Sequence, residues 1–322
     1  MSHSKETLRH YLSLAVQEAR KFRGATAPNP PVGAIGLSQT GEILSLKAHE
    51  KAGTGHAEAK VIEDCRARGI LSKLDTLLIT LEPCNHFGRT PPCTEAILKA
   101  AKESALKSVY YGVPDPNPQV TGQGAQRLKD AGLSVVNLND PEAIELLEPF
   151  SHWAIHRRPW VTLKTAYNAE GSMIPPLGQK TFSSPEALRL AHELRKNADA
   201  ILTGSGTVLS DQPELTVRLV PDHPGKSRWL AVLDRRKRVP ESWIEGRKRA
   251  GFQVYLGQDL DETLAFLGEK GVLEVLVEAG PLLTETFLSR SLWNHHVIIT
   301  PEGIKNVYRH HSEKGNDFPN RS

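Results

Sequence analysis

Short apolar segments alternate with amphipathic segments along most of the chain, and this alternation restricts the fold more than any other feature of the sequence. Apolar runs between turn residues are typical of buried strands, and apolar residues three and four positions apart are typical of helices. Strands that alternate with helices predict a mostly parallel sheet covered by helices on both faces. The alternation runs to about residue 138 and restarts near residue 160, so the sequence predicts two α/β halves.

The first half is expected to open with an amphipathic helix and to end with a helix over Pro141–Ile155. Between them we expect strands over Val32–Leu37, Ile43–Leu46, Thr76–Leu81, Lys107–Gly112 and Leu133–Leu138, and helices over His56–Arg68, Thr94–Ala101 and Gln123–Asp130. In the second half we expect strands over Trp160–Ala166, Ala200–Thr203, Trp229–Leu233, Gln253–Leu256, Leu273–Glu278 and His296–Thr300, and helices over Pro185–Asn197, Leu260–Lys270 and Leu282–Arg290. Residues 301–322 are polar, and we interpret them as a frayed tail.

Length and composition indicate a globular protein of two domains, which we expect at residues 1–147 and 148–322. No stretch approaches the roughly 18 apolar residues that a membrane span needs, and charged residues interrupt the opening segment as they would not in a signal peptide. Three cysteines in such a chain favour metal binding or simple burial over a disulfide framework. We therefore expect a cytoplasmic protein without a membrane partner.

The strongest chemical signal is His56 and Glu58 followed by Cys84, after a proline, and by Cys93. One imidazole and two thiolates supply three ligands for zinc and leave the fourth position for water, which is the catalytic pattern. Zinc lowers the pKa of that water to about 7. Glu58 stands two residues from His56, close enough to act as the general acid and base. This arrangement is the signature of zinc-dependent deaminases of amino-pyrimidines and purines.

The spacing of the two cysteines departs from the usual motif, because eight residues separate them here instead of two. The alternative interpretation is two buried cysteines and a surface histidine, and Pro-Cys alone would favour it. The zinc site is favoured because the histidine, the glutamate and both cysteines of the motif are all present and follow one another in the usual order. Cys65 stands in the middle of an expected helix with no partner motif, and we interpret it as a small buried apolar residue.

The segment PCNHFGRTPPC resembles the deaminase domain of the bifunctional riboflavin-biosynthesis deaminase/reductases. The segments APNPPVG, HEKAG and PDPNPQVTGQG add to the resemblance, which covers nearly all of residues 1–145. It implies a cytidine-deaminase-like three-layer domain. It also implies that Asn29 and His49 contact the pyrimidine of the substrate and that Arg89 lies near the substrate's phosphate.

The second half contains no strong motif of its own. Gly204-Ser205-Gly206 follows a strand and could approach a phosphate, although a tight turn is the commoner explanation. Lys164, Arg195 and Arg218 could form an anion site, although isolated basic residues are usually solvated. The residues alone therefore allow a nucleotide or phosphate ligand without requiring one.

The segments PWVTLKTA, ADAILTGSGTVLSDQPELTVRL, LAVLD and VLVEAGP resemble the reductase domain of the same family, which is similar to dihydrofolate reductase in fold. The resemblance implies an NADPH site and a phosphoribosyl substrate site. The implied NADPH contacts are Ala166, Thr181, Thr207, Asp211 and Gly280. The implied substrate contacts are Lys164, Arg195, Leu215, Arg218 and Glu278. Arginines suit a phosphate because a guanidinium binds two oxygens at once.

Three departures from the family pattern lie in the second half. The aspartate of a family turn is Glu170, the position of a family tryptophan holds Thr181, and the usual segment after VIIT is absent. The second domain is therefore expected to be shortened at its C-terminus.

Three functions follow from these patterns. The leading one is a bifunctional enzyme of riboflavin biosynthesis that deaminates 2,5-diamino-6-(5-phosphoribosylamino)pyrimidin-4-one and then reduces the ribosyl chain of the aminouracil product with NADPH. The second is a deaminase whose second domain only binds substrate or holds an oligomer together. The third is a nucleic-acid deaminase, which the basic run at 235–238 would favour. The balanced charge of residues 1–150 opposes it, since nucleic-acid sites carry a basic footprint. We expect a homo-oligomer with a small-molecule substrate and no nucleic-acid partner.

Overall fold

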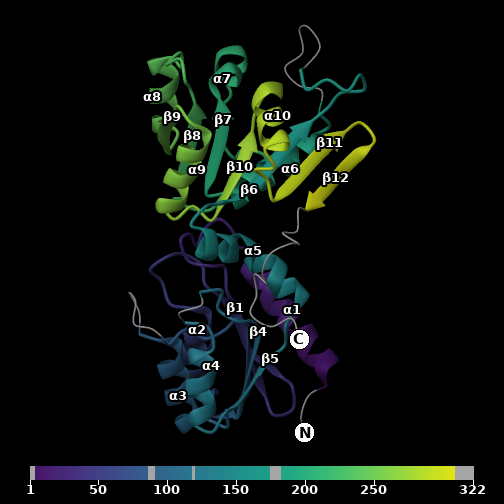
Figure 1. Ribbon diagram of the computed structural model, residues 1–322. Helices are drawn as coiled ribbons and strands as arrows, with labels where there is room; N and C mark the ends of the chain where they lie inside the picture. The colour runs from purple at the N-terminus through teal and green to yellow at the C-terminus, as the bar shows by residue number, and fades with distance from the viewer. Residues whose placement is uncertain (1–3, 86–90, 118–119, 175–182, 309–322) are drawn as a thin grey trace. The chain divides into compact units, whose positions relative to one another are not determined.

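The computed structural model describes residues 4–85, 91–117, 120–174 and 183–308, shown in Figure 1. These residues divide into two compact units, one ending at Ile155 and the other beginning at His156. The boundary that we expect after residue 147 falls within helix α5 (Pro141–His156), and as a boundary between functional domains it stays a prediction.

The first unit is built on a five-stranded sheet in the order β2-β1-β3-β4-β5. Its strands are β1 (Gly33–Ser38), β2 (Ile43–Ala48), β3 (Leu74–Leu81), β4 (Ser108–Val113) and β5 (Ser134–Asn137). The pairs β3–β4 and β4–β5 are parallel, but β1 runs antiparallel to both of its neighbours. The expectation of a mostly parallel sheet is therefore wrong for this edge, where a short connection of four residues, 39–42, joins β1 directly to β2 instead of a helical crossover.

Helices cover both faces of this sheet (Figure 1). On one face, α1 (Lys5–Arg20) packs Leu8 and Leu12 against Ile35 and Leu78. The other face carries α2 (Ala57–Ala67), α3 (Cys93–Glu103) and α4 (Gln123–Asp130), and a short 3-10 turn, η1 (Leu71–Lys73), precedes β3. The resulting three layers bury strand side chains on both faces, which explains why β3 reads as a nearly continuous apolar run.

The second unit is built on a seven-stranded sheet in the order β12-β11-β6-β10-β7-β8-β9. Its strands are β6 (Trp160–Ala166), β7 (Ala200–Gly204), β8 (Arg228–Leu233), β9 (Phe252–Gly257), β10 (Glu274–Glu278), β11 (His295–Thr300) and β12 (Gly303–Tyr308). The first six in sequence run parallel. Their carboxyl ends therefore lie along one edge of the sheet, where open α/β sheets bind their ligands.

The interpretation of residues 301–322 as a frayed tail is wrong for Gly303–Tyr308, which forms β12 and pairs antiparallel with β11. The strand was missed because five of its six residues are exposed, so it lacks the apolar run of a buried strand. His295 holds it in place: its ring stacks on Tyr308, and its Nε2 lies 2.9 Å from Asn306 Oδ1. Residues 309–322 lie outside the described part of the chain.

Helices also cover both faces of the second sheet. Helices α9 (Leu260–Glu269) and α10 (Pro281–Ser289) pack on one face, and α6 (Pro185–Asn197), α7 (Ser205–Asp211) and α8 (Glu241–Arg249) pack on the other. The sequence did not predict α7 or α8. Gly204-Ser205-Gly206 begins a short helix rather than a tight turn, and only Trp243 and Ile244 of α8 are buried.

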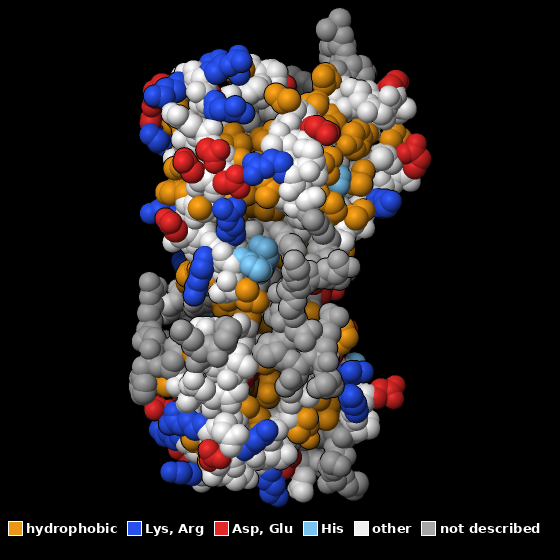
Figure 2. Space-filling model, in the orientation of Figure 1, with side chains coloured by type: hydrophobic (Ala, Val, Ile, Leu, Met, Phe, Trp, Pro, Cys, Tyr) orange, Lys and Arg blue, Asp and Glu red, His pale blue; other side chains and the backbone are white. Residues whose placement is uncertain are grey.

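Acidic and basic side chains are interspersed on the face of the molecule that Figure 2 shows. Lys248 and Glu245 form an exposed ion pair at 2.7 Å, and exposed pairs of this kind contribute little to stability. Among the helices that the structure describes, none is both long enough and apolar enough to cross a bilayer.

Candidate functional site

The three expected zinc ligands lie together in the first unit. His56 is the residue immediately before α2, Cys93 is the first residue of α3, and Cys84 follows the end of β3. Their ligand atoms all lie within 4.8 Å of one another. Both helices begin at this point, and the positive end of a helix dipole favours a thiolate.

The contacts between the three side chains show how they share protons. His56 Nδ1 lies 3.1 Å from Cys93 Sγ, and the Cys93 backbone N–H donates to Cys84 Sγ over 3.3 Å. Hydrogen bonds from Cys93 and then from His56 lower the pKa of the Cys84 thiol, whereas the Cys84 sulfur and burial raise the pKa of Cys93. Cys84 is thus the thiolate, and Cys93 and His56 are its hydrogen-bond donors. A metal ion that binds the three side chains would take the place of the shared protons.

Glu58 lies in the first turn of α2 with 3% of its surface exposed. Its Oε2 has no hydrogen-bond partner among the described residues. Burial, and then the charge of Cys84, raises the pKa of the Glu58 carboxyl. An uncompensated carboxylate oxygen in a buried site is costly. Together with a donor set of one nitrogen and two sulfurs, it shows that the site fits a zinc ion with a proton-carrying ligand beside it.

Glu82 holds a separate segment of chain against the metal ligands. Its buried carboxylate accepts backbone N–H groups from Asp115 at 3.2 Å, Gly122 at 3.0 Å and Ala125 at 3.1 Å. These donors belong to the segment after β4 and to the first turn of α4. A carboxylate that accepts several backbone N–H groups fixes the backbone that donates them.

The start of α4 lies so close to the Pro-Cys segment that only glycine fits there. A Cβ on Gly124 would stand 1.9 Å from the carbonyl oxygen of Pro83. One turn further along α4, the Arg127 guanidinium donates to Asn85 Oδ1 over 2.8 Å and to Thr94 Oγ1 over 3.1 Å. Arg127 thus links the residues that follow the two cysteine ligands.

Two of the expected pyrimidine contacts, Asn29 and His49, also lie together. His49 is 2% exposed, and its ring packs edge-on against the ring of His56 with centroids 5.4 Å apart. Asn29 Nδ2 lies 3.2 Å from His49 Nε2. The site therefore has an amide and an imidazole beside the three metal ligands. Arg89, the expected phosphate contact, lies outside the described residues.

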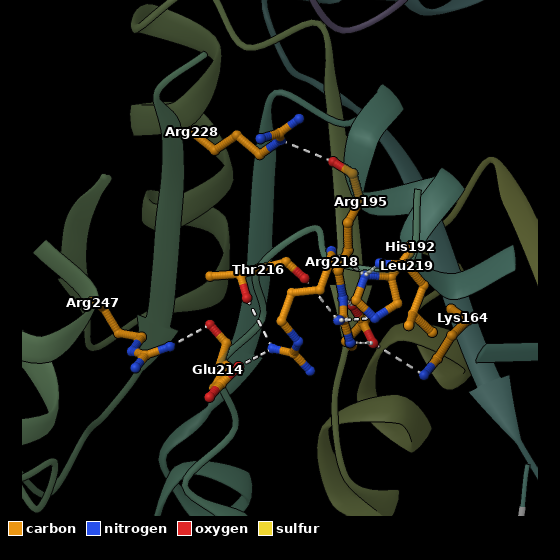
Figure 3. Close-up of polar contacts among 10 residues, drawn as sticks. Lys164, His192, Arg195, Glu214, Thr216, Arg218, Leu219, Arg228 and Arg247 are labelled. Carbon is orange, nitrogen blue, oxygen red and sulfur yellow. Dashed lines mark hydrogen bonds and ion pairs between the residues drawn. The ribbon is translucent and has the colours of Figure 1, made fainter. Parts of the chain in front are cut away.

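The second unit brings together three of the expected substrate contacts, Lys164, Arg195 and Glu278, of which Figure 3 labels the first two. Glu278, at the end of β10, is 7% exposed and accepts two hydrogen bonds from Arg195, Nε–Oε1 at 2.5 Å and Nη2–Oε2 at 2.9 Å. Lys164 Nζ donates to Oε2 over 3.1 Å. Burial alone would raise the pKa of Glu278, but the charges of Lys164 and Arg195 lower it to about 2. The cluster of two cations and one anion carries a net positive charge at the ligand-binding edge of the sheet.

Arg218 and Leu215 lie on the segment between α7 and β8. The Arg218 guanidinium is exposed and contacts Glu214 and Thr216 Oγ1, not Glu278. The Leu215 side chain is buried in the core near α8, so this residue can offer a ligand only its backbone. Lys164 and Arg195 thus meet at Glu278, while the Arg218 guanidinium contacts other partners, and the anion site stays a prediction.

Of the expected NADPH contacts, Ala166, Thr207 and Gly280 lie near the carboxyl ends of β6, β7 and β10. Ala166 ends β6, Asp211 is the exposed last residue of α7, and Gly280 immediately precedes α10. The Gly280 N–H donates to Thr207 Oγ1 over 3.1 Å, which joins the first turns of α7 and α10. Thr181 lies outside the described residues.

Two residues at these sites escaped the sequence analysis. Glu82 stands two residues before Cys84, but nothing in its neighbourhood indicates partners 33 to 43 residues later. His192 stands three residues before Arg195 on α6, on the same helix face, and that spacing was the one available signal.

Two family models match the chain. The cytidine and deoxycytidylate deaminase zinc-binding region matches residues 5–112, and the RibD C-terminal domain matches residues 159–301. The expected deaminase-like first domain and reductase-like second domain are thereby confirmed as the fold class.

Similar proteins resemble the chain over most of its length. It is 37% identical over 318 residues to the riboflavin biosynthesis protein RibD of Aquifex aeolicus (strain VF5), across 91% of this chain and 86% of that protein. It is 36% identical over 321 residues to RibD of Bacillus amyloliquefaciens, across 91% and 84%.

Two solved structures show the same arrangement of folds. The first is a diaminohydroxyphosphoribosylaminopyrimidine deaminase/5-amino-6-(5-phosphoribosylamino)uracil reductase from Thermotoga maritima, 28% identical, with a TM-score of 0.81 over 92% of this chain and 87% of that one. The second is Acinetobacter baumannii RibD, form 1, 27% identical, with a TM-score of 0.78 over the same shares.

Proposed function

The chain belongs to the RibD family of riboflavin biosynthesis proteins, and from this membership we propose how its residues divide the work of a zinc-dependent deaminase and an NADPH-dependent reductase. Residues 1–147 form the deaminase and residues 148–322 the reductase. The observation that carries the deaminase assignment is the buried Glu58 carboxylate, one oxygen of which has no hydrogen-bond partner among the described residues, beside three metal-ligand side chains.

In the deaminase, His56, Cys84 and Cys93 hold the zinc ion. Zinc bound there supplies a Lewis acid that makes water acidic enough to ionise near neutral pH. Glu58 accepts a proton from the attacking water and delivers it to the amino group that leaves as ammonia. Its raised pKa suits both transfers, because a group that accepts and returns a proton works best with a pKa near the working pH.

Asn29 and His49 bind the pyrimidine beside this centre, and Arg89 binds near the phosphate. We propose the substrate named for the Thermotoga maritima protein, a diaminopyrimidinone that carries a phosphoribosylamino group. The amide of Asn29 offers both a donor and an acceptor, which suits an amino-pyrimidinone edge. Deamination at the carbon that bears the 2-amino group yields the aminouracil.

In the reductase, Lys164, Arg195 and Glu278 bind the ribosyl part of the aminouracil, and Arg218 and the backbone of Leu215 complete the substrate site. Ala166, Thr181, Thr207, Asp211 and Gly280 hold NADPH. The cofactor supplies the hydride, and the protein aligns it with the sugar carbon that is reduced. The net positive charge of the Lys164–Glu278–Arg195 cluster supports a phosphorylated substrate.

The departures from the family pattern leave this cluster in place. Residues 168–171 still form a turn, in which the Gly171 N–H donates to the carbonyl of Asn168 over 3.0 Å, so Glu170 replaces aspartate without loss of the turn. We propose that the reductase is active in this chain.

A product assay tests the whole assignment. Zinc-loaded protein receives the phosphoribosyl diaminopyrimidinone with and without NADPH, and products are separated by mass. We expect deamination in both tubes and a ribityl product only with NADPH. The Glu58→Gln variant should lose deamination while it still reduces supplied aminouracil. Deamination without any reduction would limit catalysis to the first domain and support a non-catalytic second domain. No conversion by folded, zinc-loaded protein would refute the substrate.

We propose further that the enzyme works in the cytoplasm and as a homo-oligomer. Among the described residues, β12 is the last strand at one edge of the seven-stranded sheet, and an edge strand can pair with another chain. Light scattering of the purified protein measures the oligomeric state, and a monomer at micromolar concentration would contradict the second proposal.

A further inference from the structure

A strained backbone segment, residues 214–219, lies between α7 and β8 and carries the exposed Arg218. Leu215 within it has φ 56°, in the left-handed region that bulky residues rarely adopt. A residue keeps such a conformation only where its surroundings over-determine it. The contacts that surround this segment therefore decide where Arg218 is held.

Three side chains hold the segment, as Figure 3 shows. The Arg195 guanidinium donates to the carbonyl of Thr216 over 3.2 Å, and Arg247 of α8 donates to the carbonyl of Glu214 over 2.6 Å. His192 Nδ1 accepts the backbone N–H of Arg218 over 2.8 Å, with the N–H of Leu219 at 3.4 Å.

His192 is therefore an acceptor at Nδ1, since a backbone N–H can only donate. The ring is 4% exposed and keeps its proton on Nε2, which lies 3.5 Å from Arg195 Nη1. Two groups that both carry protons do not hydrogen-bond to each other, so the role of the ring toward the segment runs through Nδ1. The charged groups that face it are Arg195 from its own helix, Arg218 from the segment and Glu278 from β10. Burial, and then the positive charges of Arg195 and Arg218, lower the pKa of His192 and keep its ring neutral, although the charge of Glu278 acts in the opposite direction.

We propose that His192 is a positioning residue of the reductase: by accepting the Arg218 backbone N–H, it holds segment 214–219 beside the Arg195–Glu278 pair, so that the substrate's phosphoribosyl group meets Arg195 and Arg218 together. This inference rests on the proposed assignment of both arginines to the substrate site. His192 and Arg195 stand on the same face of α6. One helix therefore supplies both the cation of the site and the acceptor that fixes the neighbouring segment.

The test compares His192→Leu with His192→Asn in the full-length, zinc-loaded protein. Leucine removes the acceptor, whereas the Asn Oδ1 can take the place of Nδ1. For His192→Leu we expect KM for the aminouracil to rise roughly 10- to 100-fold, as for the loss of a buried hydrogen bond. kcat and KM for NADPH should stay within about threefold of the parent values. His192→Asn should restore most of the loss. Arg189→Ala, an exposed change on the same helix, is the matched control.

The pH dependence supplies a second readout. Protonation of Nδ1 would turn the acceptor into a donor that faces two other donors. KM for the aminouracil should therefore rise in the parent protein as the pH falls below 6.5, since the pKa of His192 lies below that ordinary value. The His192→Asn variant should lack this component. The phosphate of the substrate titrates in both proteins and cancels in the comparison.

The outcomes separate the inference from the function it rests on. If Arg218→Gln leaves KM for the aminouracil unchanged, the proposed substrate site is wrong. If Arg218→Gln raises KM but His192→Leu does not, or if the pH profiles of the parent and His192→Asn coincide, only the role of His192 is refuted. A fall in kcat together with an equal rise in KM for the aminouracil and in KM for NADPH would show a purely structural role. If His192→Leu fails to fold, shown by loss of the urea transition that the tryptophans of the second unit report, His192→Asn and its pH profile decide.

Discussion

His49 Nε2 lies 3.2 Å from the side-chain Nδ2 of Asn29, and His49 Nδ1 lies 3.2 Å from the carbonyl oxygen of Gly55. A carbonyl only accepts, so the proton of the neutral ring is on Nδ1, and Nε2 accepts from the Asn29 NH2 group. Burial lowers the pKa of His49 and keeps this neutral form. The Oδ1 of Asn29 takes no part in this hydrogen bond, and in the proposed function it is the acceptor for an amino group of the pyrimidine.

Substitution of either residue should weaken the deaminase without loss of zinc. For Asn29→Ala and for His49→Leu we expect kcat/KM for deamination to fall roughly 10- to 100-fold, because each change removes or misorients one buried hydrogen-bonding group at the pyrimidine. Steady-state kinetics and zinc analysis of the same samples check this. The reductase activity of each variant is the folding control. A variant with full deaminase activity would exclude the amide from substrate binding.

Zinc binding should become weaker as the pH falls. The pKa of Cys93 and that of His56 are raised in the metal-free cluster, so both groups carry protons that zinc must displace. The apparent affinity should fall about tenfold per pH unit for each proton released. Competition with a chromophoric chelator between pH 8 and pH 6 measures it. Cys93→Ser should weaken binding strongly, whereas Cys65→Ser should not, and a pH-independent affinity would contradict the shared-proton cluster.

Gly124→Ala should damage the first unit. The new methyl would meet the Pro83 carbonyl oxygen, so α4 must move away from the residues that lead to Cys84. We expect a loss of about 1–3 kcal/mol in the free energy of unfolding, together with faster release of zinc. Gly246→Ala on α8 is the matched control, since a methyl there meets nothing within 4 Å and should stabilise the helix by roughly 0.5–1 kcal/mol. Calorimetry of both variants is the measurement.

Glu278→Gln should destabilise the second unit, because it leaves Lys164 and Arg195 without their anion. Removal of one partner from a buried pair costs about 3–5 kcal/mol, and the partial exposure of Lys164 places the expected loss near the lower value. The folded pKa of about 2 lies below the ordinary 4.5, so the ion pair stabilises fully above pH 4.5 and loses its effect as the pH falls toward 2. The difference in the free energy of unfolding between the parent protein and Glu278→Gln should therefore decrease as the pH falls from 4.5 to 2.

Urea unfolding followed by tryptophan fluorescence measures this difference. Four of the five tryptophans, Trp160, Trp229, Trp243 and Trp293, belong to the second unit and report on it. A difference that stays constant down to pH 2 would show that Glu278 is not the titrating group.

The sequence predicted most elements because most of them bury a clear apolar face. The helices over residues 123–130 and 185–197 and the strand over 160–166 lie where they were expected. The missed elements, α7, α8 and β12, bury few side chains, so their periodicity is weak. The direction of β1 depends on which strand lies beside it, which hydrophobic pattern does not encode.

The metal site was easier to predict than the substrate site of the reductase. The zinc ligands and Glu58 carry recognisable chemistry at short spacings. Glu278 pairs with Lys164 across 114 positions, and only the register of β6 with β10 brings them together. The sequence places His192 on the same helix face as Arg195 but does not show its partners, because these are backbone groups 26 and 27 residues later.

Glu82 has a consequence for the order in which the deaminase matures. Its carboxylate accepts three backbone N–H groups that lie 33 to 43 residues further along the chain, and these bonds hold that segment beside the residues that lead to Cys84. Small zinc modules are unfolded until the metal binds and organises them. The three hydrogen bonds to Glu82 need no metal, so we expect the pocket to form before the ion binds. Removal of zinc should then abolish deamination while circular dichroism of the metal-free protein keeps the signal of the folded chain.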